Sequence, residues 1–513
     1  MLSIKEILSA CNGELINGDT GEAYLETVVT SICTDTRKIE SGALFVPIKG
    51  DQFDGHDYVG EALTKGALCA LTQDKSMGHG PLIFVESTRR ALMDIAAYYR
   101  RKHDIKVVAI TGSAGKTTTK DMIACVLARK YKTKRTLGNF NNDIGLPLSI
   151  FQLTPEDEVL VLEMGMNHGG EITELSRVGA PDIVVITNIG DAHIENFANR
   201  EGILHAKLEI LDGLTPGGTA IFNGNDPLLT GDIAKAKAHG FRLLYPNARN
   251  IKSMDTKSID GGRSHFHING NDIHAHIPVP GAHMVMNALL AATVGIEMGL
   301  SPEEVSMGFD DFVPPGGRLT VMEFGGMTLI NDVYNANPAS MMEGIKVVVG
   351  QDGRKVCILG GMNELGQVSR ERHKEVGNFA AEAGVNMLIT IGQMAWWINE
   401  GFYDAIRIRQ ADLGRVGNQP LLDESAERLF DMPKRSTDYR GGSSLNMGPE
   451  IGAILRRSIE EEEDIPQSAL HFESVEGFLA EWRSVLRKDD IVLIKASRGM
   501  AFENIIRGLG AKV

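Results

Sequence analysis

Cysteine is scarce in this chain: five cysteines stand in 513 residues, far apart and with no C-x-x-C pair. An odd number of scattered cysteines does not make a disulfide framework, and no zinc-type spacing of Cys and His is present. Reduced thiols are the natural interpretation, and they are typical of a protein that stays in the cytosol.

Long hydrophobic runs are also missing. No apolar stretch reaches the ~18 residues that a membrane-spanning helix needs, and the opening MLSIKE lacks the layout of a secretory signal peptide. We therefore expect a cytoplasmic protein without a stable membrane anchor.

Positive charge is in deficit. Lys and Arg number 52 against 67 Asp and Glu, which gives a net charge of −15. A general nucleic-acid binder needs a basic face, so we expect no nucleic-acid partner, and an anionic substrate would require local basic pockets. No G-x-S-x-G elbow stands at a convincing strand–helix turn, which argues against a serine hydrolase.

A phosphate-binding loop is the most informative feature that is present. The stretch TGSAGKTTTK (111–120) follows an apolar run and precedes a segment typical of a helix, 120–130. Backbone N–H groups at such a turn and the helix N-terminus favour an anion. Lys116 can reach the β- and γ-phosphates, and Thr117 can place its hydroxyl on Mg²⁺. The expected ATP contacts here are Gly112, Ser113, Ala114, Gly115, Lys116, Thr117 and Thr118.

The loop is shorter than the general pattern G-x-x-x-x-G-K-[ST], whose first glycine would fall on Ile110. A glycine turn with an ordinary lysine is the alternative. The flanking strand and helix favour the phosphate cradle, so the sequence predicts a nucleoside triphosphate site.

Polar residues follow other expected strands. Glu163 could bind the Mg²⁺ that Thr117 holds, or it could be a surface carboxylate at a strand end. His193 could be a metal ligand or contact phosphate, although a lone histidine is more often structural. Lys207, judged by its neighbours alone, is an exposed helical lysine. Asn141 and Asn142 could hydrogen-bond a polar substrate.

The order of strand and helix patterns predicts an α/β protein with three domains. The expected domains are a small α/β domain (1–86), a central P-loop domain with a parallel sheet (87–313), and a Rossmann-like domain (314–513) after the linker PPGG. Expected strands of the two larger sheets lie at 106–111, 159–164, 182–188, 219–223, 327–331, 355–359, 387–391 and 491–495. An antiparallel flap is expected at 255–280, and a helix at 284–298 carries Asn287 in its first turn.

Residues 402–467 break this rhythm, with no clear strands, an RGGSS stretch and an acidic run at 460–464. A loop of that length inside a compact domain is uncommon. We interpret it as a solvated insertion with a helix at 448–462; the alternative is a partner-binding element.

Taken together, the motifs are similar to those of the Mur ligase family over nearly the whole chain. The matching pieces are DTR (35–37), the Lys49–Gly50 and DGH (54–56) segments, TGSAGKTTTK (111–120), GNFNNDIGLPL (138–148), EMGMNHGGEI (163–172), TNIGDAHIENF (187–197), PGAHMVMNALLA (280–291), GGRL (316–319), NDVYNANPASM (331–341), GGMNELG (360–366) and KASRGM (495–500). The YNANP and DGH segments resemble the branch of the family that adds a dipeptide.

The resemblance implies the reaction. ATP phosphorylates the terminal carboxylate of a UDP-N-acetylmuramoyl-tripeptide, and the amine of D-alanyl-D-alanine attacks the acyl phosphate to give the amide, ADP and phosphate. Such an enzyme has to position polyanions, neutralise charge with Mg²⁺ and keep water from the acyl phosphate. These two substrates are the expected partners, and we expect a monomer.

The resemblance also implies roles for individual residues. The catalytic residues of the family match Lys116, Glu163, His193 and Lys207. Its metal site matches Thr117, Glu163 and His193. At this metal site, Lys207 matches a lysine that is carbamylated in related ligases. The nucleotide contacts of the family match Asn287, Arg318, Asp332 and Asn335. Of these, Asp332 is expected near the ribose and Asn335 near the adenine. Substrate contacts match Thr36, Arg37, Lys49, Asp54, Gly55 and His56 in the uridine-nucleotide domain, Asn141 and Asn142 in the cleft, and Asn363, Glu364, Leu365, Ser497 and Arg498 at the dipeptide.

Two features depart from the family. Gly361 stands where an aspartate is frequent, and the 402–467 insertion is longer than usual. A second hypothesis is a different amino-acid ligase, either of the Mur type or similar to folylpolyglutamate synthase; the DGH domain argues against the folate enzyme. A third hypothesis is a nucleotide switch, which would not need Asp332, Asn335 or a third domain.

Overall fold

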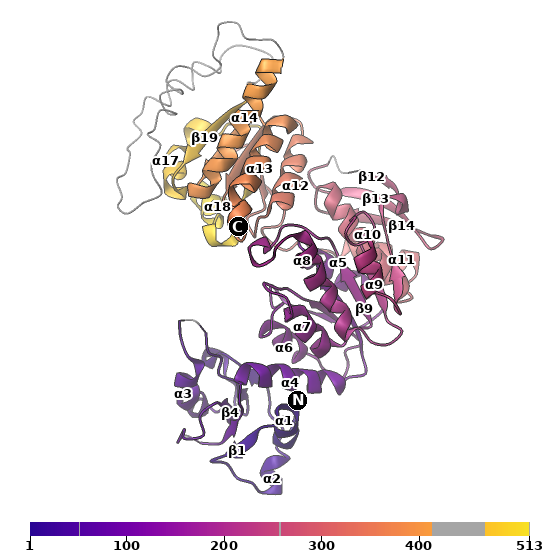
Figure 1. Cartoon of the computed structure of the whole chain (residues 1–513), viewed down its shortest axis with the longest axis vertical. Coiled ribbons are helices and arrows are strands. Elements are labelled where there is room, and N and C mark those ends of the chain that lie inside the picture. Colours follow the sequence, from indigo (N-terminus) through magenta and orange to yellow (C-terminus); the bar gives the residue numbers. More distant parts are fainter. Residues whose placement is uncertain (51, 79, 256–257, 413–466, 512–513) are drawn as a thin grey trace. The chain divides into compact units, whose positions relative to one another are not determined.

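The fold is taken from a computed structural model, which describes residues 1–50, 52–78, 80–255, 258–412 and 467–511. The chain divides into two compact units: Met1–Pro315 with Glu364–Gly366, and Gly316–Asn363 with Gln367–Val513. Figure 1 shows the elements of both units. The first unit holds the two N-terminal α/β sheets and a small antiparallel sheet, and the second holds the C-terminal sheet.

The N-terminal sheet has the strand order β1-β5-β4-β3-β2, parallel except for β1. Its strands are short, and the apolar run 43–48 contributes only Leu44–Phe45. Its elements are α1 (Ile4–Cys11), β1 (Glu14–Ile16), α2 (Glu22–Leu25), β2 (Ile32–Cys33), β3 (Leu44–Phe45), α3 (Val59–Thr64), β4 (Cys69–Thr72) and β5 (Leu82–Phe84).

Helix α4 (Thr88–Arg101) joins this sheet to the next. Its N-terminus is capped by the Ser87 hydroxyl, which accepts from the Arg90 N–H. Apolar side chains such as Leu92, Ile95 and Ala96 recur at helical spacing and are fully buried. They belong to one hydrophobic core that also takes in residues of the N-terminal and central sheets.

The central sheet is entirely parallel, in the order β11-β10-β9-β6-β8-β7. The four predicted strands are confirmed, whereas the edge strands β7 and β11, which have three residues each, were not predicted. Its elements are β6 (Lys106–Thr111), α5 (Lys116–Leu127), β7 (Thr133–Arg135), α6 (Gly145–Ile150), β8 (Val159–Glu163), α7 (Glu171–Gly179), β9 (Ile183–Ile186), α8 (Arg200–Leu208), β10 (Thr219–Phe222), α9 (Asp232–Lys237) and β11 (Arg242–Leu244).

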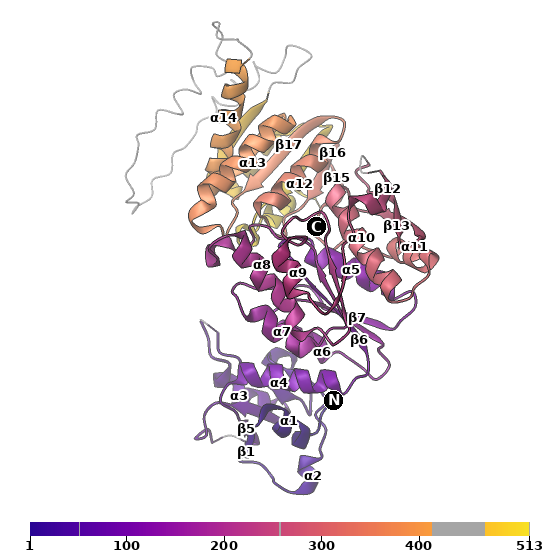
Figure 2. The same ribbon diagram turned by 45° about the vertical axis from the view of Figure 1, so that its right-hand side comes forward.

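Alternate residues of the central strands face opposite layers. Val107 and Ala109 of β6 lie in the core shared with α4, α6 and α7, while Val108 and Ile110, which are equally buried, point to the other face. Helix α5 packs with α10 (Ala282–Glu297) and α11 (Pro302–Asp310). The parallel sheet is therefore covered by helices on both faces, as the sequence predicted (Figure 2).

The predicted flap at 255–280 is confirmed as antiparallel pairing. The small sheet has the order β12-β13-β14, with β12 (Ile251–Met254), β13 (Gly262–Ile268) and β14 (Asn271–Ile277). The helix that follows begins at Ala282, two residues earlier than expected. Asn287 therefore lies in its second turn, and its placement in the first turn was wrong.

The second unit has a six-stranded sheet in the order β15-β16-β20-β17-β18-β19, parallel except for β15. One face packs on a core with α17 and α18, and α12, α13 and α14 pack together along the chain. Its elements are β15 (Thr320–Phe324), β16 (Met327–Asn331), α12 (Pro338–Val349), β17 (Arg354–Gly360), α13 (Ser369–Ala383), β18 (Met387–Ile391), α14 (Trp396–Asp412), β19 (Ser468–Phe472), α17 (Val475–Val485), β20 (Asp490–Lys495) and α18 (Glu503–Leu509).

The predicted start of the insertion at 402 was wrong, because α14 continues to Asp412. Phe402 is fully buried in this helix and belongs to the fold. The helix expected at 448–462 lies outside the described residues. None of the helices in the described ranges is long and apolar enough to cross a bilayer.

Candidate active site

The glycine loop forms at the carboxyl end of β6, between β9 and β8. Gly112 has φ +151° and Gly115 has φ +80°, both in the region that favours glycine. A Cβ on Gly112 would lie 1.9 Å from the Thr187 hydroxyl, so no side chain fits there. Helix α5 begins at Lys116, four residues before the segment expected to be helical. The loop thus ends at a helix N-terminus, as a phosphate cradle requires.

The loop after β9 fixes the shape of this cradle. The Ser113 N–H donates to the Asn188 carbonyl at 3.0 Å, and the Ala114 N–H donates to the Asn188 side-chain oxygen at 2.9 Å. The Gly190 N–H donates to the Ser113 hydroxyl at 2.8 Å. The amino group of Lys116 donates to the Gly112 carbonyl at 2.8 Å. Asn188 was not named as a functional residue from the sequence, although it lies in the TNIGD segment.

Helix α10 closes the other side of the cradle. A Cβ on Gly115 would lie 2.8 Å from the side-chain oxygen of Asn287, so the amide packs directly against the loop. Asn287 is buried, as are Thr117 and Thr118. Asn287 therefore lies beside the phosphate loop.

Glu163 is buried at the end of β8, with 2% of its surface exposed. The alternative of a surface carboxylate is therefore wrong. One oxygen, Oε1, accepts from the Asn141 side-chain amide at 2.8 Å. The other, Oε2, is buried without a hydrogen-bond partner. An unpartnered carboxylate oxygen beside a phosphate loop fits a hard cation, because Mg²⁺ prefers oxygen ligands and carboxylates.

Other candidate metal ligands do not complete a cluster by themselves. His193 follows β9 in a left-handed conformation, with φ 61° and a half-buried residue surface. In the parts of the chain that the structure describes, no three His, Cys, Asp or Glu residues form a group that could hold a metal ion. A cation here would need oxygen ligands from Thr117 and from the nucleotide.

Lys207 is buried, with 1% exposed, so its interpretation as an exposed helical lysine was wrong. It lies in α8, whose N-cap is Asn199. Burial lowers its pKa well below the ordinary value, and the positive charge of Lys116 lowers it further. A lysine amine held neutral in this way is a nucleophile, which is what reaction with carbon dioxide requires.

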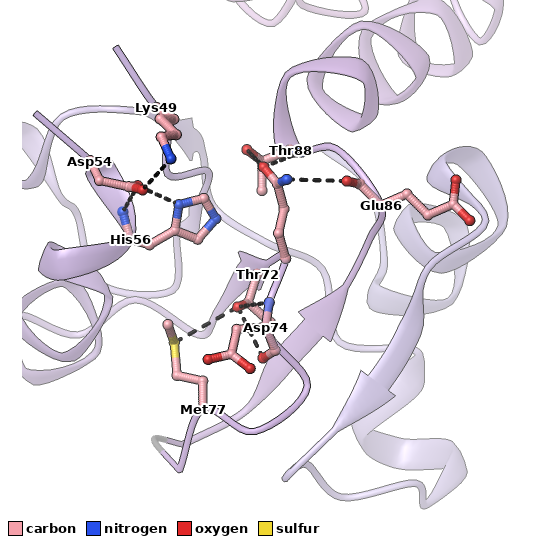
Figure 3. A network of polar contacts seen from close by, with 9 residues as sticks. Lys49, Asp54, His56, Thr72, Asp74, Met77, Glu86 and Thr88 are labelled. Atoms are coloured by element: carbon pink, nitrogen blue, oxygen red, sulfur yellow. Dashed lines mark hydrogen bonds and ion pairs between the residues drawn. The ribbon is translucent and has the colours of Figure 1, made fainter. Parts of the chain in front are cut away.

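Three of the residues predicted to bind substrate in the N-terminal domain, Lys49, Asp54 and His56, lie close together (Figure 3). The Asp54 carboxylate lies 2.6 Å from Nδ1 of His56 and 3.8 Å from the Lys49 amino group. A Cβ on Gly55 would lie 2.6 Å from the backbone nitrogen of Ile48, which explains the glycine. Nε2 of His56 is buried without a partner. This orphaned ring nitrogen marks the group as a polar binding site.

Strand β4 and the start of α4 supply polar groups that the sequence reasoning missed. The Thr72 hydroxyl accepts from the Asp74 N–H at 3.0 Å, and the Thr88 hydroxyl donates to the Gln73 side chain at 3.2 Å. Figure 3 shows these residues with the His56 group. His56 contributes to lowering the pKa of Asp74, although hydrogen bonds from Ser76 are the larger cause.

Thr36 and Arg37 lie in a separate turn of this domain. Both nitrogens of the Arg37 fork bind the Asp35 carboxylate at 2.8 Å. This pairing and the backbone bond from Arg37 lower the pKa of Asp35 to about 2. The Arg37 side chain is 85% exposed, so its outer face is open to a ligand.

In the second unit, the predicted residues meet at the carboxyl ends of three adjacent strands, β16, β20 and β17. The Arg498 N–H donates to the Asn335 side chain at 3.3 Å, and the Asn363 N–H donates to the Ser497 hydroxyl at 2.8 Å. Such strand ends are where ligands bind in open α/β sheets. The unit division separates Glu364 and Leu365 from Asn363 and groups them with the first unit.

Lys495 lies at the centre of this cluster and was not predicted as a site residue. It is 2% exposed, and its amino group is 2.6 Å from the Asp332 carboxylate and 2.9 Å from the Asn335 carbonyl. A lysine at the end of an apolar strand was the signal that could have found it. Arg318 is stacked over the Tyr334 ring, with its guanidinium carbon 3.9 Å from the ring centre.

The fold and the site together define a P-loop protein of the α/β class. Each of the two larger sheets has polar residues at the carboxyl ends of its parallel strands, and a glycine loop stands at a helix N-terminus. Three segments match parts of one family: 28–107 the "Mur ligase family, catalytic domain", 110–295 the "Mur ligase middle domain", and 317–416 the "Mur ligase, glutamate ligase domain".

Similar proteins point to the same family. The UDP-N-acetylmuramoyl-tripeptide–D-alanyl-D-alanine ligase of Bacillus subtilis is 38% identical over 78% of this chain and 87% of its own length. The Escherichia coli protein of the same name is 33% identical over 77% of this chain and 86% of its own. A crystal structure of MurF from Acinetobacter baumannii superposes with a TM-score of 0.81 at 26% identity, covering 99% of this chain and 98% of that one. This chain belongs to the Mur ligase family.

Proposed function

We propose that this protein is an ATP-dependent amide ligase that adds D-alanyl-D-alanine to a UDP-N-acetylmuramoyl-tripeptide, in the synthesis of peptidoglycan precursors. The observation that carries the proposal is the phosphate cradle on β6, with the buried Glu163 beside it, in a chain that matches ligases of this activity along most of its length. The UDP-linked and ATP substrates are cytoplasmic metabolites, which supports action in the cytoplasm.

In the first unit, the loop from Gly112 to Thr118 would hold the ATP phosphates, with Lys116 against the transferred group. Thr117, Glu163 and His193 would hold Mg²⁺, which when bound neutralises phosphate charge. Asn141 holds one oxygen of Glu163 at 2.8 Å, and the other oxygen, which is buried without a hydrogen-bond partner, would be available to the cation. Asn142 precedes α6 and fixes the same loop, because its side-chain oxygen accepts from the Gly145 N–H at 2.9 Å.

Lys207 is proposed to be carbamylated. Its buried amine would add to carbon dioxide, forming an N–C bond and releasing one proton, and the product is an anion with two oxygens. The neutral amine beside Lys116 thereby becomes an anion that could serve as a carboxylate-like ligand for a second Mg²⁺. This anion would also attract the positive charge of Lys116.

The uridine nucleotide is proposed to bind at the edge of the N-terminal sheet, near Lys49, Gly55 and His56, with Thr36 and Arg37 in reach. A pyrophosphate needs cations and backbone N–H groups, and this edge offers both. In the second unit, Arg318, Asp332 and Asn335 are proposed as contacts of the ATP nucleoside. The proposed contacts of the dipeptide are Asn363, Glu364, Leu365, Ser497 and Arg498.

The chemistry follows from these positions. The terminal carboxylate of the tripeptide attacks the γ-phosphorus of ATP, and ADP leaves. The dipeptide amine then attacks the acyl carbon, the phosphate leaves, and the amine loses a proton. Lys116 stabilises charge on the transferring phosphoryl group, and the buried surroundings of Glu163 and Lys207 keep water away from the acyl phosphate.

A phosphate-release assay with a panel of acceptors tests this proposal. We expect release that requires both the UDP-N-acetylmuramoyl-tripeptide and D-alanyl-D-alanine. Dependence on a single amino acid would instead indicate a different Mur-type or folylpolyglutamate-synthase-like ligase. Release without any acceptor would indicate a nucleotide switch.

The substitution Lys116→Ala tests the cradle itself. Loss of one charged donor to the transferring phosphoryl group should lower kcat by about 100-fold or more while the protein stays folded. A melting curve like that of the wild type serves as the control. Retained turnover would show that the loop is not the phosphoryl-donor site.

A further inference from the structure

The loop that follows β17 is held by an unusual set of bonds. Three consecutive backbone N–H groups each donate to a side chain: Gly361 to the Met500 sulfur at 2.8 Å, Met362 to Nε2 of His373 at 2.9 Å, and Asn363 to the Ser497 hydroxyl at 2.8 Å. The acceptors come from α13 and from the segment after β20. The backbone of this loop is therefore fixed residue by residue.

His373 is the most deeply buried of the three acceptors, with 0% exposed. It lies on α13, and its Nδ1 is 2.6 Å from the carbonyl of Ser369, one turn earlier. A carbonyl only accepts, so Nδ1 carries the hydrogen, and a backbone N–H only donates, so Nε2 carries none. One neutral tautomer satisfies both neighbours, and burial, which lowers the pKa of His373, keeps the ring neutral.

The ring cannot easily move from this position. Trp397 of α14 meets it edge-on, with ring centres 5.7 Å apart and planes at 74°. The bond to Ser369 ties the ring to its own helix, and α13 packs on both α12 and α14. Nε2 is thus a fixed acceptor, built on rigid elements and aimed at a single backbone group.

We infer that His373 is a positioning residue for the dipeptide acceptor. It touches no substrate; it fixes the Met362 N–H and thereby the orientation of Asn363, the next residue, which the proposed function places against D-alanyl-D-alanine. The inference rests on that proposed function. Its effect should fall on the acceptor: the phosphate loop and the uridine-nucleotide residues lie in the other unit, and the proposed nucleoside contacts Asp332 and Asn335 bond to Lys495 and Arg498 rather than to residues 361–363.

Two substitutions separate the loop contact from the helix contact. In His373→Gln, the side-chain oxygen reaches the place of Nε2 and can still accept from Met362, but the bond to Ser369 is lost. In His373→Asn, the amide lies near the place of Nδ1 and can still donate to Ser369, but it does not reach Met362. Each variant loses one buried hydrogen bond, so the pair is matched for stability.

The measurement is steady-state kinetics with all three substrates varied. We expect His373→Asn to raise the KM for D-alanyl-D-alanine by about 10-fold, with the KM values for ATP and the UDP-tripeptide unchanged, since misplacing a binding loop costs about that much. His373→Gln should keep the dipeptide KM within about 3-fold of the wild type.

Equal dipeptide KM values in the two variants, or equal changes for all three substrates, would overturn the inference while leaving the proposed function intact. Wild-type turnover that does not depend on the dipeptide would overturn the proposed function, and the inference with it. Hydrogen exchange of residues 360–366 gives a readout that does not need His373→Asn to fold. We expect the same protection in His373→Gln as in the wild type, and faster exchange in that variant would contradict the inference.

Discussion

Two buried lysines of the first unit show how one residue type takes different roles. Lys207 is held without its usual solvation beside another cation, which favours the neutral amine. Lys120 is equally buried, but its amino group donates to the Thr136 carbonyl at 2.8 Å and lies 3.3 Å from the Asp121 carboxylate. The first surroundings favour chemical modification, and the second favour a structural charge.

For Lys207, the expected result is a carbamate that depends on carbon dioxide. Protein prepared in ¹³C-bicarbonate should show a carbamate carbon signal by NMR that is absent in Lys207→Ala, and removal of carbon dioxide should lower turnover. Lys207→Arg is the matched control, because it keeps a cation that cannot form the carbamate. Full activity of Lys207→Arg would contradict the assignment.

Lys120 is expected to act on the metal site through the backbone. The Thr136 hydroxyl accepts from the Glu163 N–H at 3.1 Å, so the lysine that fixes Thr136 also fixes Glu163. Lys120→Met keeps the length and removes the charge. We expect about a 10-fold higher Mg²⁺ requirement and a loss of about 1–3 kcal/mol of stability, because a buried carbonyl loses its donor.

The stability loss alone would also follow from a purely structural role, so the Mg²⁺ titration is the deciding measurement for Lys120. Lys134 of β7 provides a control: it lies on the neighbouring edge strand and is only half-buried. Lys134→Met should leave the Mg²⁺ requirement unchanged. The same Mg²⁺ requirement in Lys120→Met and the wild type would refute the coupling.

At the scale of elements, the apolar central strands could be predicted from the sequence. The edge strands and the site residues at the strand ends could be predicted only in part. All eight strands expected for the two large sheets exist, because each is a buried apolar run between turn residues. The edge strands β7, β11, β15 and β19 escaped recognition. Strand β7 is the polar segment Thr133–Arg135, with no apolar residue to mark it. Periodicity does not reveal a strand of three polar residues, because there is no apolar alternation to detect.

Site residues divide in the same way. The glycine loop and Glu163 could be predicted because a motif or a strand end marks them. Lys495 was missed because its role arises from a contact with Asp332, far along the chain. His373 was missed because helical spacing does not show that its ring bonds to the Met362 N–H in the preceding loop. The burial of Lys207 could not be read from its neighbours, since a helix surface looks alike in sequence whether solvent or another element covers it.

Helix α13 carries a test based on pH. Burial lowers the pKa of His373 below the value of 6.5 that it has when unfolded. The unfolded state therefore takes up the proton first, and the stability contribution is fully present above about pH 6.5 and falls as the pH falls below it. Calorimetric melting from pH 7.5 to pH 5 should show a steeper loss in the wild type than in His373→Gln, by about 1 kcal/mol.

His471 is half-buried, and desolvation lowers its pKa as well, so it contributes to the same loss. His471 and all the carboxylates are present in both the wild type and His373→Gln. The difference in pH dependence between the two sets of melting curves therefore isolates the contribution of His373. Parallel curves for wild type and variant would mean that His373 does not titrate between the folded and unfolded states in this range.

At the scale of the whole molecule, the sequence predicted three α/β domains, and the sheets follow that order along the chain. The domain boundaries at 86/87 and 313/314 stay predictions. Contact between α1 and α4, and between α4 and α7, joins the N-terminal and central sheets into one core. Sequence patterns mark each sheet but not whether neighbouring sheets share a core.

The segment 413–466 supports a prediction at this scale. It begins after α14, and its two flanks lie together, since Arg409 donates to the Gln467 side chain at 3.1 Å. Replacement by a short Gly-Ser linker should leave ATP affinity within about 2-fold, because the phosphate loop lies in the other unit and the proposed nucleoside contacts lie by β15 and β16, on the opposite side of the sheet from β19. Titration of the folded deletion with ATP measures this, and a lost affinity would contradict it.

The central claim is that the tripeptide carboxylate is activated as an acyl phosphate. Its most direct test uses UDP-N-acetylmuramoyl-tripeptide labelled with ¹⁸O in the terminal carboxylate, with ATP, Mg²⁺ and D-alanyl-D-alanine. The carboxylate oxygen that attacks ATP leaves with the phosphate, so mass spectrometry should find one ¹⁸O in the phosphate for each amide formed. Phosphate without the label would contradict the account.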